Sequence, residues 1–355
     1  MRLFLAATAA SLCALTGLAG AETFTASSVR VEHAAAVLTV IPEDRTTIDV
    51  AVSGGARVAA PSVRLADGAV VVDGGLRNRI RDCGGPSVRI TGVGSVPRGE
   101  LPRITIRTPR TMALSVGGAV FADIGASAGG AVALHGCGDT RIGPASGALD
   151  VTLNGSGDVS IAPAAAALDV TLNGSGDMDA VRAGGMLAAA LNGSGSLRID
   201  RADAGATLRQ NGSGDLRVGD VGGPLDARLN GSGSLCVGAV GGDTRLALTG
   251  SGDVEAGAVN GALEAELRGS GEIEVASVSG PRAALRTSSS GDIRVRGGRV
   301  DQLDARTTGS GNIRFGGAAG ATRAHVSGSG DISIADAGRV EQIVDTGSGD
   351  VRLGR

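Results

Sequence analysis

Residues 153–158 read Leu-Asn-Gly-Ser-Gly-Asp, and residues 172–177 repeat the same six letters nineteen positions later. The Gly-Ser-Gly triplet, or a close variant, recurs at intervals of nineteen or twenty residues through the rest of the chain. Copies open at Gly136, Gly155, Gly174, Gly193, Gly212, Gly231, Gly250, Gly269, Ser289, Gly309, Gly328 and Gly347. Repetition at a fixed period outweighs other local signals in assigning a fold. The chain is therefore a repeat array.

Each repeat alternates apolar and polar residues after its glycine turn. Val159 and Ile161 flank Ser160, and most later turns are followed by the same order. A period of two is typical of a strand with one buried face. A second alternating run precedes the turn, as in residues 149–153 and 225–229. The repeats lack the periodicity and caps of helices, so we expect two short strands and two turns in each.

Such a repeat cannot bury its apolar stripe alone, but coils stacked in parallel form a narrow continuous core. A β-propeller is excluded because a four-stranded blade needs about 40 residues. We predict an all-β, single-stranded parallel β-helix (β-solenoid) of about 12 coils of 19–20 residues over 111–355. Residues 22–110 are less regular but rich in strand patterns. We expect them to form the N-terminal β cap and first irregular coils, with a separate small β-domain as the alternative.

Composition limits the partner classes. The 355 residues include 61 Gly but only 10 Pro, and the glycines are periodic, which argues against disorder. All basic residues are arginine, and the formal net charge of −3 gives no electrostatic reason to expect nucleic acid.

The N-terminus has the features of an export signal. Arg2 precedes the apolar residues 3–18, and Ala-Gly-Ala at 19–21 forms a small-residue cleavage site. We therefore predict a signal peptide over 1–21. No later stretch approaches the ~18 apolar residues of a membrane-spanning helix. The mature chain is expected in the periplasm, on the outer surface or secreted.

Three cysteines remain in the mature chain: Cys83, Cys137 and Cys236. Cys137 replaces the serine of a glycine turn, and Cys83 lies in another glycine-rich turn. A disulfide between these two is the candidate pairing in an oxidising compartment. Cys236 would then be a free, outward-facing thiol, either incidental or used for dimerisation.

An acidic residue follows the glycine turn in most repeats. The column includes Asp139, Asp158, Asp177, Asp331 and Asp350. In stacked strands, neighbours would lie about 4.8 Å apart and repel by roughly 1 kcal/mol in water. Turn amides and arginines two residues further along would offset this repulsion, which favours a structural role. The alternative is a calcium site, because carboxylates beside glycine turns bind calcium in other β-helices.

Five successive turns are preceded by asparagine. These residues are Asn154, Asn173, Asn192, Asn211 and Asn230. Stacked amides can hydrogen-bond along a ladder, and asparagine tolerates left-handed backbone. We predict an amide ladder rather than glycosylation at these Asn-Gly-Ser sequences.

The serial Gly-Ser-Gly-Asp turns resemble the putative auto-transporter adhesin head GIN domain family, bacterial exported proteins of unknown biochemical function. Residues 104–109 and 114–118 are similar to that family's lead-in to its first glycine turn, and 29–31, 38–40 and 47–52 resemble its N-terminal strands. The resemblance covers essentially the whole mature chain. It implies a right-handed β-helix and an adhesin-like role. No translocator barrel is expected after the last turn, so the auto-transporter part of the name is not carried over.

No catalytic constellation stands out in the sequence. The carboxylate columns are explained by the repeat, His33, His135 and His325 stand alone, and no Trp or Tyr exists for a sugar platform. We predict a non-enzymatic structural or binding protein of the cell envelope that needs no cofactor and recognises an envelope, cell-surface or polysaccharide ligand. The alternative is a polysaccharide-binding or polysaccharide-cleaving β-helix. Self-association through the C-terminal coil is a third hypothesis.

Overall fold

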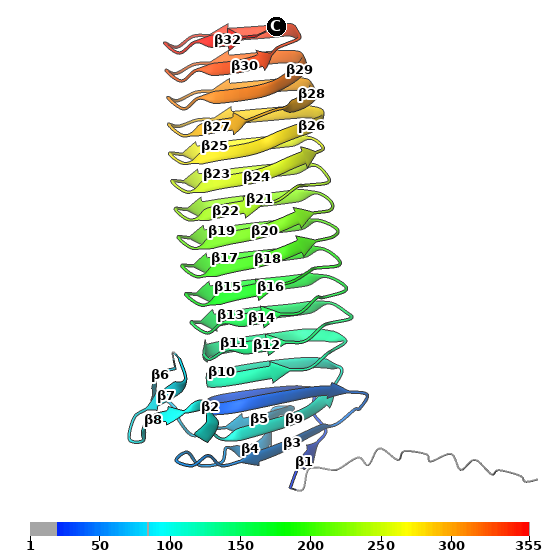
Figure 1. Ribbon diagram of the computed structural model, residues 1–355, viewed down its shortest axis with the longest axis vertical. Helices are drawn as coiled ribbons and strands as arrows, with labels where there is room; N and C mark the ends of the chain where they lie inside the picture. The colour runs from blue at the N-terminus through cyan, green and yellow to red at the C-terminus, as the bar shows by residue number, and fades with distance from the viewer. Residues whose placement is uncertain (1–19, 84, 355) are drawn as a thin grey trace, which may run out of the picture.

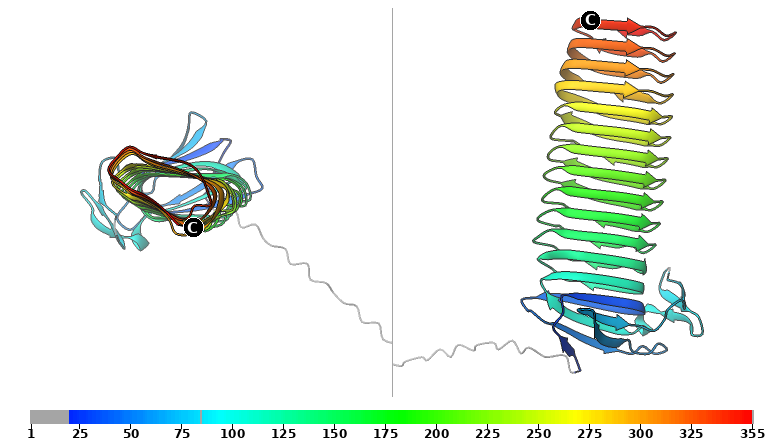
Figure 2. Two further views of the ribbon diagram at one scale, coloured as in Figure 1. Left: turned by 90° about the horizontal axis from the view of Figure 1, so that it is seen from above. Right: turned by 180° about the vertical axis from the view of Figure 1, so that it is seen from behind.

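The computed structural model describes residues 20–83 and 85–354. Parallel coils stack along one axis into a β-solenoid of about 13 turns, with a wider cap at the N-terminal end (Figure 1). Seen along the axis, the coils superpose as a flattened ring (Figure 2). The predicted fold class is confirmed. The predicted signal peptide lies outside the described residues, apart from its last two.

Two faces of the solenoid consist of parallel sheet. The first face contains β11 (Gly129–Cys137), β13 (Leu149–Gly155), β15 (Leu168–Gly174), β17 (Leu187–Gly193), β19 (Ala206–Gly212), β21 (Leu225–Gly231), β23 (Thr244–Gly250), β25 (Leu263–Gly269) and β31 (Arg339–Asp345). The second face contains β12 (Thr140–Ile142), β14 (Val159–Ile161), β16 (Asp177–Ala180), β18 (Ser196–Ala202), β20 (Asp215–Val221), β22 (Ser234–Val237), β24 (Asp253–Asn260), β27 (Asp292–Val295), β30 (Ile332–Asp336) and β32 (Val351–Leu353). Four longer strands continue around a corner: β10 (Thr111–Ile124), β26 (Glu272–Thr287), β28 (Gly298–Thr307) and β29 (Ile313–Val326).

The core follows from the strand register. Leu149 pairs with Leu168, and Leu168 pairs with Leu187, so equivalent positions of successive repeats stack on one another. All three leucines are at most 2% exposed. Burying each such side chain stabilises the fold by about 1.5–3 kcal/mol. No coil can bury these side chains without its neighbours, which makes stacking obligatory.

The coil has a third inward position that the prediction of two strands and two turns did not include. Ala145, Ala164, Ala183 and Ala202 are buried and joined from coil to coil by isolated parallel bridges, and Val221, Val240 and Val259 continue the row. A single bridging residue between two turns shows no alternation. The sequence pattern therefore contained no strand signal for this third side.

Each Gly-x-Gly turn forms a close-packed corner between the two faces. The carbonyl of Gly231 accepts hydrogen bonds from the backbone N–H groups of Ser251 and Gly252 in the next coil, at 3.0 and 3.1 Å. Gly250 has a φ of +131°, and a Cβ placed on it would lie 2.2 Å from the Gly231 carbonyl oxygen. Glycine is required there both by backbone conformation and by the approach of the neighbouring coil.

One buried column carries polar substitutions. Leucine occupies the position two residues before the first turn residue in most coils. Gln210, Thr287 and Thr307 replace it, and none is more than 1% exposed. The Thr287 hydroxyl donates to the Gly291 carbonyl at 3.1 Å, and Thr307 makes the equivalent bond. Gln210 Nε2 donates to the Gly214 carbonyl in the turn of its own coil, but Gln210 Oε1 is buried without a hydrogen-bond partner.

The cap closes the N-terminal end of the core. It contains β1 (Glu22–Phe24), β2 (Ser28–Glu43), β3 (Ile48–Ser53), β4 (Ser62–Ala66), β5 (Ala69–Asp73) and β9 (Arg103–Pro109). Strand β2 pairs in parallel with β5, β9 and β10, whereas β1–β3, β3–β9 and β4–β5 are antiparallel. The cap thus changes from antiparallel sheet to the parallel stacking of the coils.

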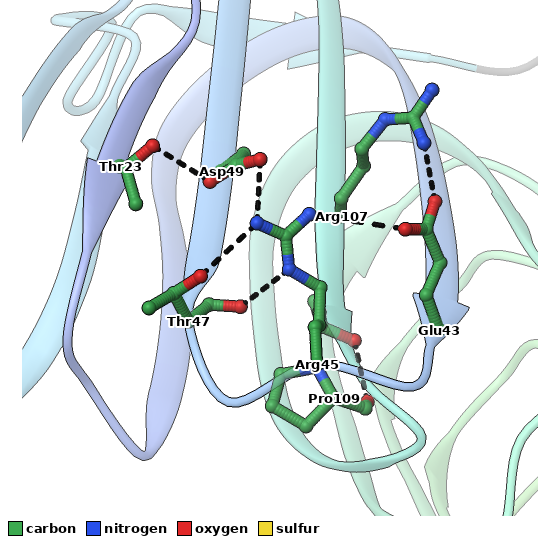
Figure 3. A network of polar contacts seen from close by, with 8 residues as sticks. Thr23, Glu43, Arg45, Thr47, Asp49, Arg107 and Pro109 are labelled. Atoms are coloured by element: carbon green, nitrogen blue, oxygen red, sulfur yellow. Dashed lines mark hydrogen bonds and ion pairs between the residues drawn. The ribbon is translucent and has the colours of Figure 1, made fainter. Parts of the chain in front are cut away.

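A polar network fixes the outer strands of the cap (Figure 3). Thr23 donates through Oγ1 to Asp49 at 2.8 Å, and Arg45 pairs with the other oxygen of the same carboxylate. The hydrogen bond from Arg45 lowers the pKa of Asp49. Arg107 pairs with Glu43 beside this network. Charge-assisted contacts of this kind stabilise the strands at the N-terminal end of the described residues.

A small sheet projects from the side of the cap (Figure 1). It consists of β6 (Ile80–Asp82), β7 (Ser87–Ile90) and β8 (Gly94–Pro97), followed by a 3-10 turn, η1 (Arg98–Glu100). Its buried residues pack with Phe121 in a separate apolar cluster. The sequence prediction placed this segment within the irregular cap and did not separate it. Within the described range, no helix is long and apolar enough to span a membrane.

Candidate ligand-binding face

The aspartates after the corners link one coil to the next. Asp158 Oδ1 accepts the backbone N–H of Asp177 at 3.3 Å, and Asp177 Oδ1 accepts that of Ser196 at 3.0 Å. Asp331 accepts the N–H of Asp350 at 2.9 Å, which lowers the pKa of Asp331. This arrangement supports the structural interpretation of the column.

Arginines neutralise part of this column. Arg352 contacts the carboxylates of Asp331 and Asp350, at 2.9 and 2.8 Å. Asp139 lies 3.9 Å from Arg98 of η1, the turn that follows the projecting sheet. The predicted compensation by the arginine two residues further along is thus found for Arg352. Asp139 is contacted by Arg98 instead, and Arg198 pairs with Asp200 of its own coil.

We predict that calcium does not stabilise the aspartate column. One oxygen of Asp158, Asp177 and Asp331 is already engaged by a backbone N–H. The melting temperature should therefore be the same in millimolar calcium and in EGTA. Scanning calorimetry of the protein measures this, with Asp177→Asn as the control that keeps the acceptor oxygen. A saturable rise in melting temperature with calcium, lost in that variant, would establish a calcium site.

The predicted amide ladder is confirmed. Asn173, Asn192 and Asn211 each donate through Nδ2 to the preceding asparagine's Oδ1 at 2.8 Å, and Asn230 does so at 3.1 Å. At the N-terminal end, Asn154 contacts His135 Nδ1 at 3.2 Å. The ladder runs along the edge of the first face next to the corners and uses the amides to join five coils.

The outward side chains of the first face divide it into two halves. The N-terminal half carries Ala131, Ala133, Asp150, Thr152, Asp169, Thr171, Ala188, Ala190 and Thr207. The C-terminal half carries Arg209, Asp226, Arg228, Arg245, Glu264, Glu266, Arg286, Asp304, Arg306 and Arg323. The N-terminal half is poor in charge, whereas the C-terminal half is densely charged.

A groove with a volume of about 740 Å³ runs along the N-terminal half. It crosses several coils, and its lining includes Met112, Leu149 and Met186. Met186 is 50% exposed, which is unusual for a large apolar side chain of this chain. Apolar concave surface with a few polar groups is the usual character of a ligand site.

Asp150 and Asp169 line this groove. They are register partners in β13 and β15, so about 4.8 Å of strand spacing separates their backbones. Among the described residues, neither carboxylate has an ion pair, whereas each acidic residue of the C-terminal half contacts an arginine. The pair is therefore the unneutralised charge of the groove.

The environment of Asp169 opposes its ionisation. Partial desolvation raises the pKa of Asp169, and the negative charge of Asp150 adds to the shift. A carboxyl group whose pKa is higher in the folded than in the unfolded state stabilises the fold at pH values below the unfolded-state pKa. This stabilisation is lost as the pH rises through the folded-state pKa. Ionised Asp169 thus weakens the fold at neutral pH. A feature that opposes stability is a candidate for function.

The cysteines and histidines lie outside the groove. Cys83 and Cys137 form a disulfide, with Cα atoms 6.0 Å apart, that ties the projecting sheet to β11. Cys236 is free and half-buried, and burial raises the pKa of its thiol. His33 and His135 line one cavity of about 500 Å³. The prediction that the histidines stand alone is wrong for this pair, because β10 lies between β2 and β11 and brings distant residues together.

These features define an all-β, parallel β-solenoid protein with a solvent-facing groove. The model of the family described as putative auto-transporter adhesin, head GIN domain, matches residues 103–239 and 259–354. The chain belongs to this family, as the resemblance in the sequence implied.

The other comparisons add little. The search of curated proteins finds no match. Among solved structures, the chain is similar to one described as a putative lipid binding protein from Parabacteroides distasonis. The identity is 15%, the coverage is 94% of this chain and 98% of that chain, and the TM-score is 0.18. A likeness at this TM-score carries no argument about the ligand.

Asp150 and Asp169 were not predicted as site residues, although residues 149–153 were predicted to form a strand. A signal was present: residues 149–158 and 168–177 place an aspartate at the same outward position in consecutive repeats. Whether an arginine from another coil neutralises such a pair depends on side-chain contacts between coils. Those contacts are visible only in the structure.

Proposed function

We propose that the chain is an exported, non-enzymatic binding protein of the bacterial cell envelope, with an adhesin-like role. Its ligand would lie against the N-terminal half of the first face. The observation that carries this proposal is the unneutralised Asp150–Asp169 pair beside an apolar groove. Membership of an adhesin-like family supports the same class of function.

The geometry suggests how binding would work. Each coil is fixed to the next by backbone hydrogen bonds in register, so the groove is rigid and little ordering entropy is lost on binding. The carboxylates accept hydrogen bonds, and Thr152 and Thr171 beside them both donate and accept. A surface polymer bearing hydroxyl or ammonium groups would fit, with its apolar parts against Met112 and Met186.

Binding to envelope material tests this proposal. The labelled mature chain is incubated with intact bacterial cells, peptidoglycan sacculi and a panel of polysaccharides. Asp150→Ala/Asp169→Ala should lose at least about tenfold in affinity, as expected when two charged contacts are removed. Asp179→Ala is the matched control, because Asp179 is an exposed carboxylate on the second face of the same coil as Asp169. Equal losses in both variants would contradict the assignment of the face.

Two further measurements test the location of the protein in the cells that produce it and its self-association. Protease treatment of intact cells should degrade the protein if it is on the surface and spare it if it is periplasmic. Sedimentation over a range of concentrations tests self-association through the C-terminal coil, which a strictly monomeric chain would refute.

A polysaccharide-cleaving enzyme is the second candidate, favoured by the same carboxylate pair. Glycosidases use two neighbouring carboxyl groups of different acidity, one of which has a raised pKa. Release of reducing ends from any polysaccharide, abolished by Asp169→Asn, would establish this activity. Binding without turnover would support the adhesin-like role instead.

A further inference from the structure

We propose that Glu32, His33 and Asp73 form a binding site for a divalent transition-metal ion at the junction of the cap and the solenoid. Each residue offers one ligand atom, and these atoms all lie within 4.8 Å of one another. The side chains are half-buried. Among the described residues, this is the one group of three His, Cys, Asp or Glu side chains close enough to bind a single metal ion.

Strand pairing and a bulge create the cluster. Strand β2 pairs with β5 so that Glu32 lies beside Asp73. On the other edge of β2, the pairing with β10 shifts register between Val116 and Gly118, so that Glu32 and His33 stand opposite the single residue Gly117. Successive residues of a regular strand point to opposite faces. The bulge changes this, and His33 Nδ1 reaches Asp73 Oδ1 at 3.4 Å.

The backbone around the cluster is held in a strained conformation. His33 has a φ of +50°, a region that side chains other than glycine rarely adopt. The carbonyls of Glu32 and His33 accept backbone hydrogen bonds from Gly74 and Leu76, at 2.9 and 3.0 Å. Histidine at this position therefore carries a conformational cost that glycine would avoid.

The carboxylates are oriented but keep oxygens available. Asp73 Oδ1 accepts the backbone N–H of Gly75 at 2.9 Å. The guanidinium groups nearest to Glu32 and Asp73 belong to Arg30 and Arg64, at 3.8 and 3.9 Å, beyond normal hydrogen-bond length. These two positive charges will weaken cation binding.

The donor set selects the metal class. Calcium and magnesium prefer oxygen ligands alone, whereas one imidazole with two carboxylates suits zinc, cobalt, nickel or manganese. Three protein ligands leave at least one coordination position for water or an external ligand. The cavity of about 500 Å³ that contains Glu32 and His33 is also lined by Asn78, Ser115 and His135. An external ligand would enter there.

Metal titration of the full mature chain tests this proposal. After treatment with a chelator and its removal, calorimetry with zinc should give one site per chain, and cobalt should show the visible absorption of a nitrogen- and oxygen-ligated ion. Asp73→Asn should weaken zinc binding by at least about tenfold, in line with loss of a ligand. His325→Ala, which removes a half-buried histidine of β29, is the control and should bind as the wild type.

His33→Gly separates a metal role from a structural one. Glycine accepts the φ of +50°, so the metal-free variant should melt at the same or a higher temperature than the wild type. The same variant should lose zinc binding and the cobalt spectrum. Absence of binding in the wild type, or unchanged binding in His33→Gly, would overturn the site. Neither result depends on the first-face ligand.

Discussion

Gly250→Ala should lower the stability of the central coils by more than about 3 kcal/mol, beyond the ~0.5–3 kcal/mol lost in most single substitutions. A Cβ at this corner would lie 2.2 Å from the Gly231 carbonyl oxygen and 3.1 Å from its nitrogen. That carbonyl accepts hydrogen bonds from two N–H groups in the coil of Gly250. Neither of the two neighbouring coils can therefore move without breaking these bonds. The φ of +131° adds conformational strain.

Hydrogen exchange followed by mass spectrometry measures this effect coil by coil. Since each repeat contacts only its neighbours, protection should fall around residues 231–271 and remain in the cap. Gly297→Ala is the matched control, because a Cβ there has nothing within 4 Å and its φ lies outside the left-handed region. If Gly250→Ala leaves exchange unchanged, the corners are not close-packed as described.

Gln210→Leu is expected to stabilise the protein by about 1–3 kcal/mol, the cost of a buried polar atom without a partner. Gln210 is fully buried, and its Oε1 has no hydrogen bond. Its register partners Leu191 and Leu229 show that the column accommodates leucine. The substitution removes the unpaired oxygen and continues the apolar column.

Thermal unfolding of the two proteins gives the comparison. Leu229→Gln is the reciprocal control and should destabilise the fold, because it places a second amide in the same column. Thr287→Val should not stabilise, since the Thr287 hydroxyl already donates to Gly291. A lower melting temperature for Gln210→Leu would show that the hydrogen bond from Gln210 Nε2 to the Gly214 carbonyl stabilises the fold by more than the unpaired Oε1 destabilises it.

The periodic part of the molecule could be predicted because each repeat shows the same alternation of apolar and polar residues beside its glycine turn. Val159 and Ile161 are buried and Ser160 is exposed, as alternation required, and the asparagines before the corners form the expected ladder. One misread repeat would not have changed the assignment. The family resemblance and the fold class rest on this redundancy.

Features that occur once in the chain could not be predicted in this way. The projecting sheet at 80–97 has three short strands and no periodic partner. The cluster of Glu32, His33 and Asp73 depends on a bulge in β2 and on the pairing of β2 with β5. The bulge shows in the sequence only as a change of phase between the buried pairs at 29/31 and 38/40, and that change does not reveal which strand pairs beside it. The exposed charge of Asp150 and Asp169 depends on which coils contribute arginine. These are tertiary properties.

The central claim is that the Gly-Ser-Gly-Asp corner is structural and that binding belongs to the first face. The serines of three successive corners, Ser156, Ser175 and Ser194, are exposed. The most direct measurement compares the affinity for intact cells of a variant with all three changed to alanine and of Asp150→Ala/Asp169→Ala. The account predicts wild-type affinity for the corner variant and at least about tenfold weaker binding for the face variant. Loss of binding in the corner variant, with the face variant unaffected and both folded, would contradict it.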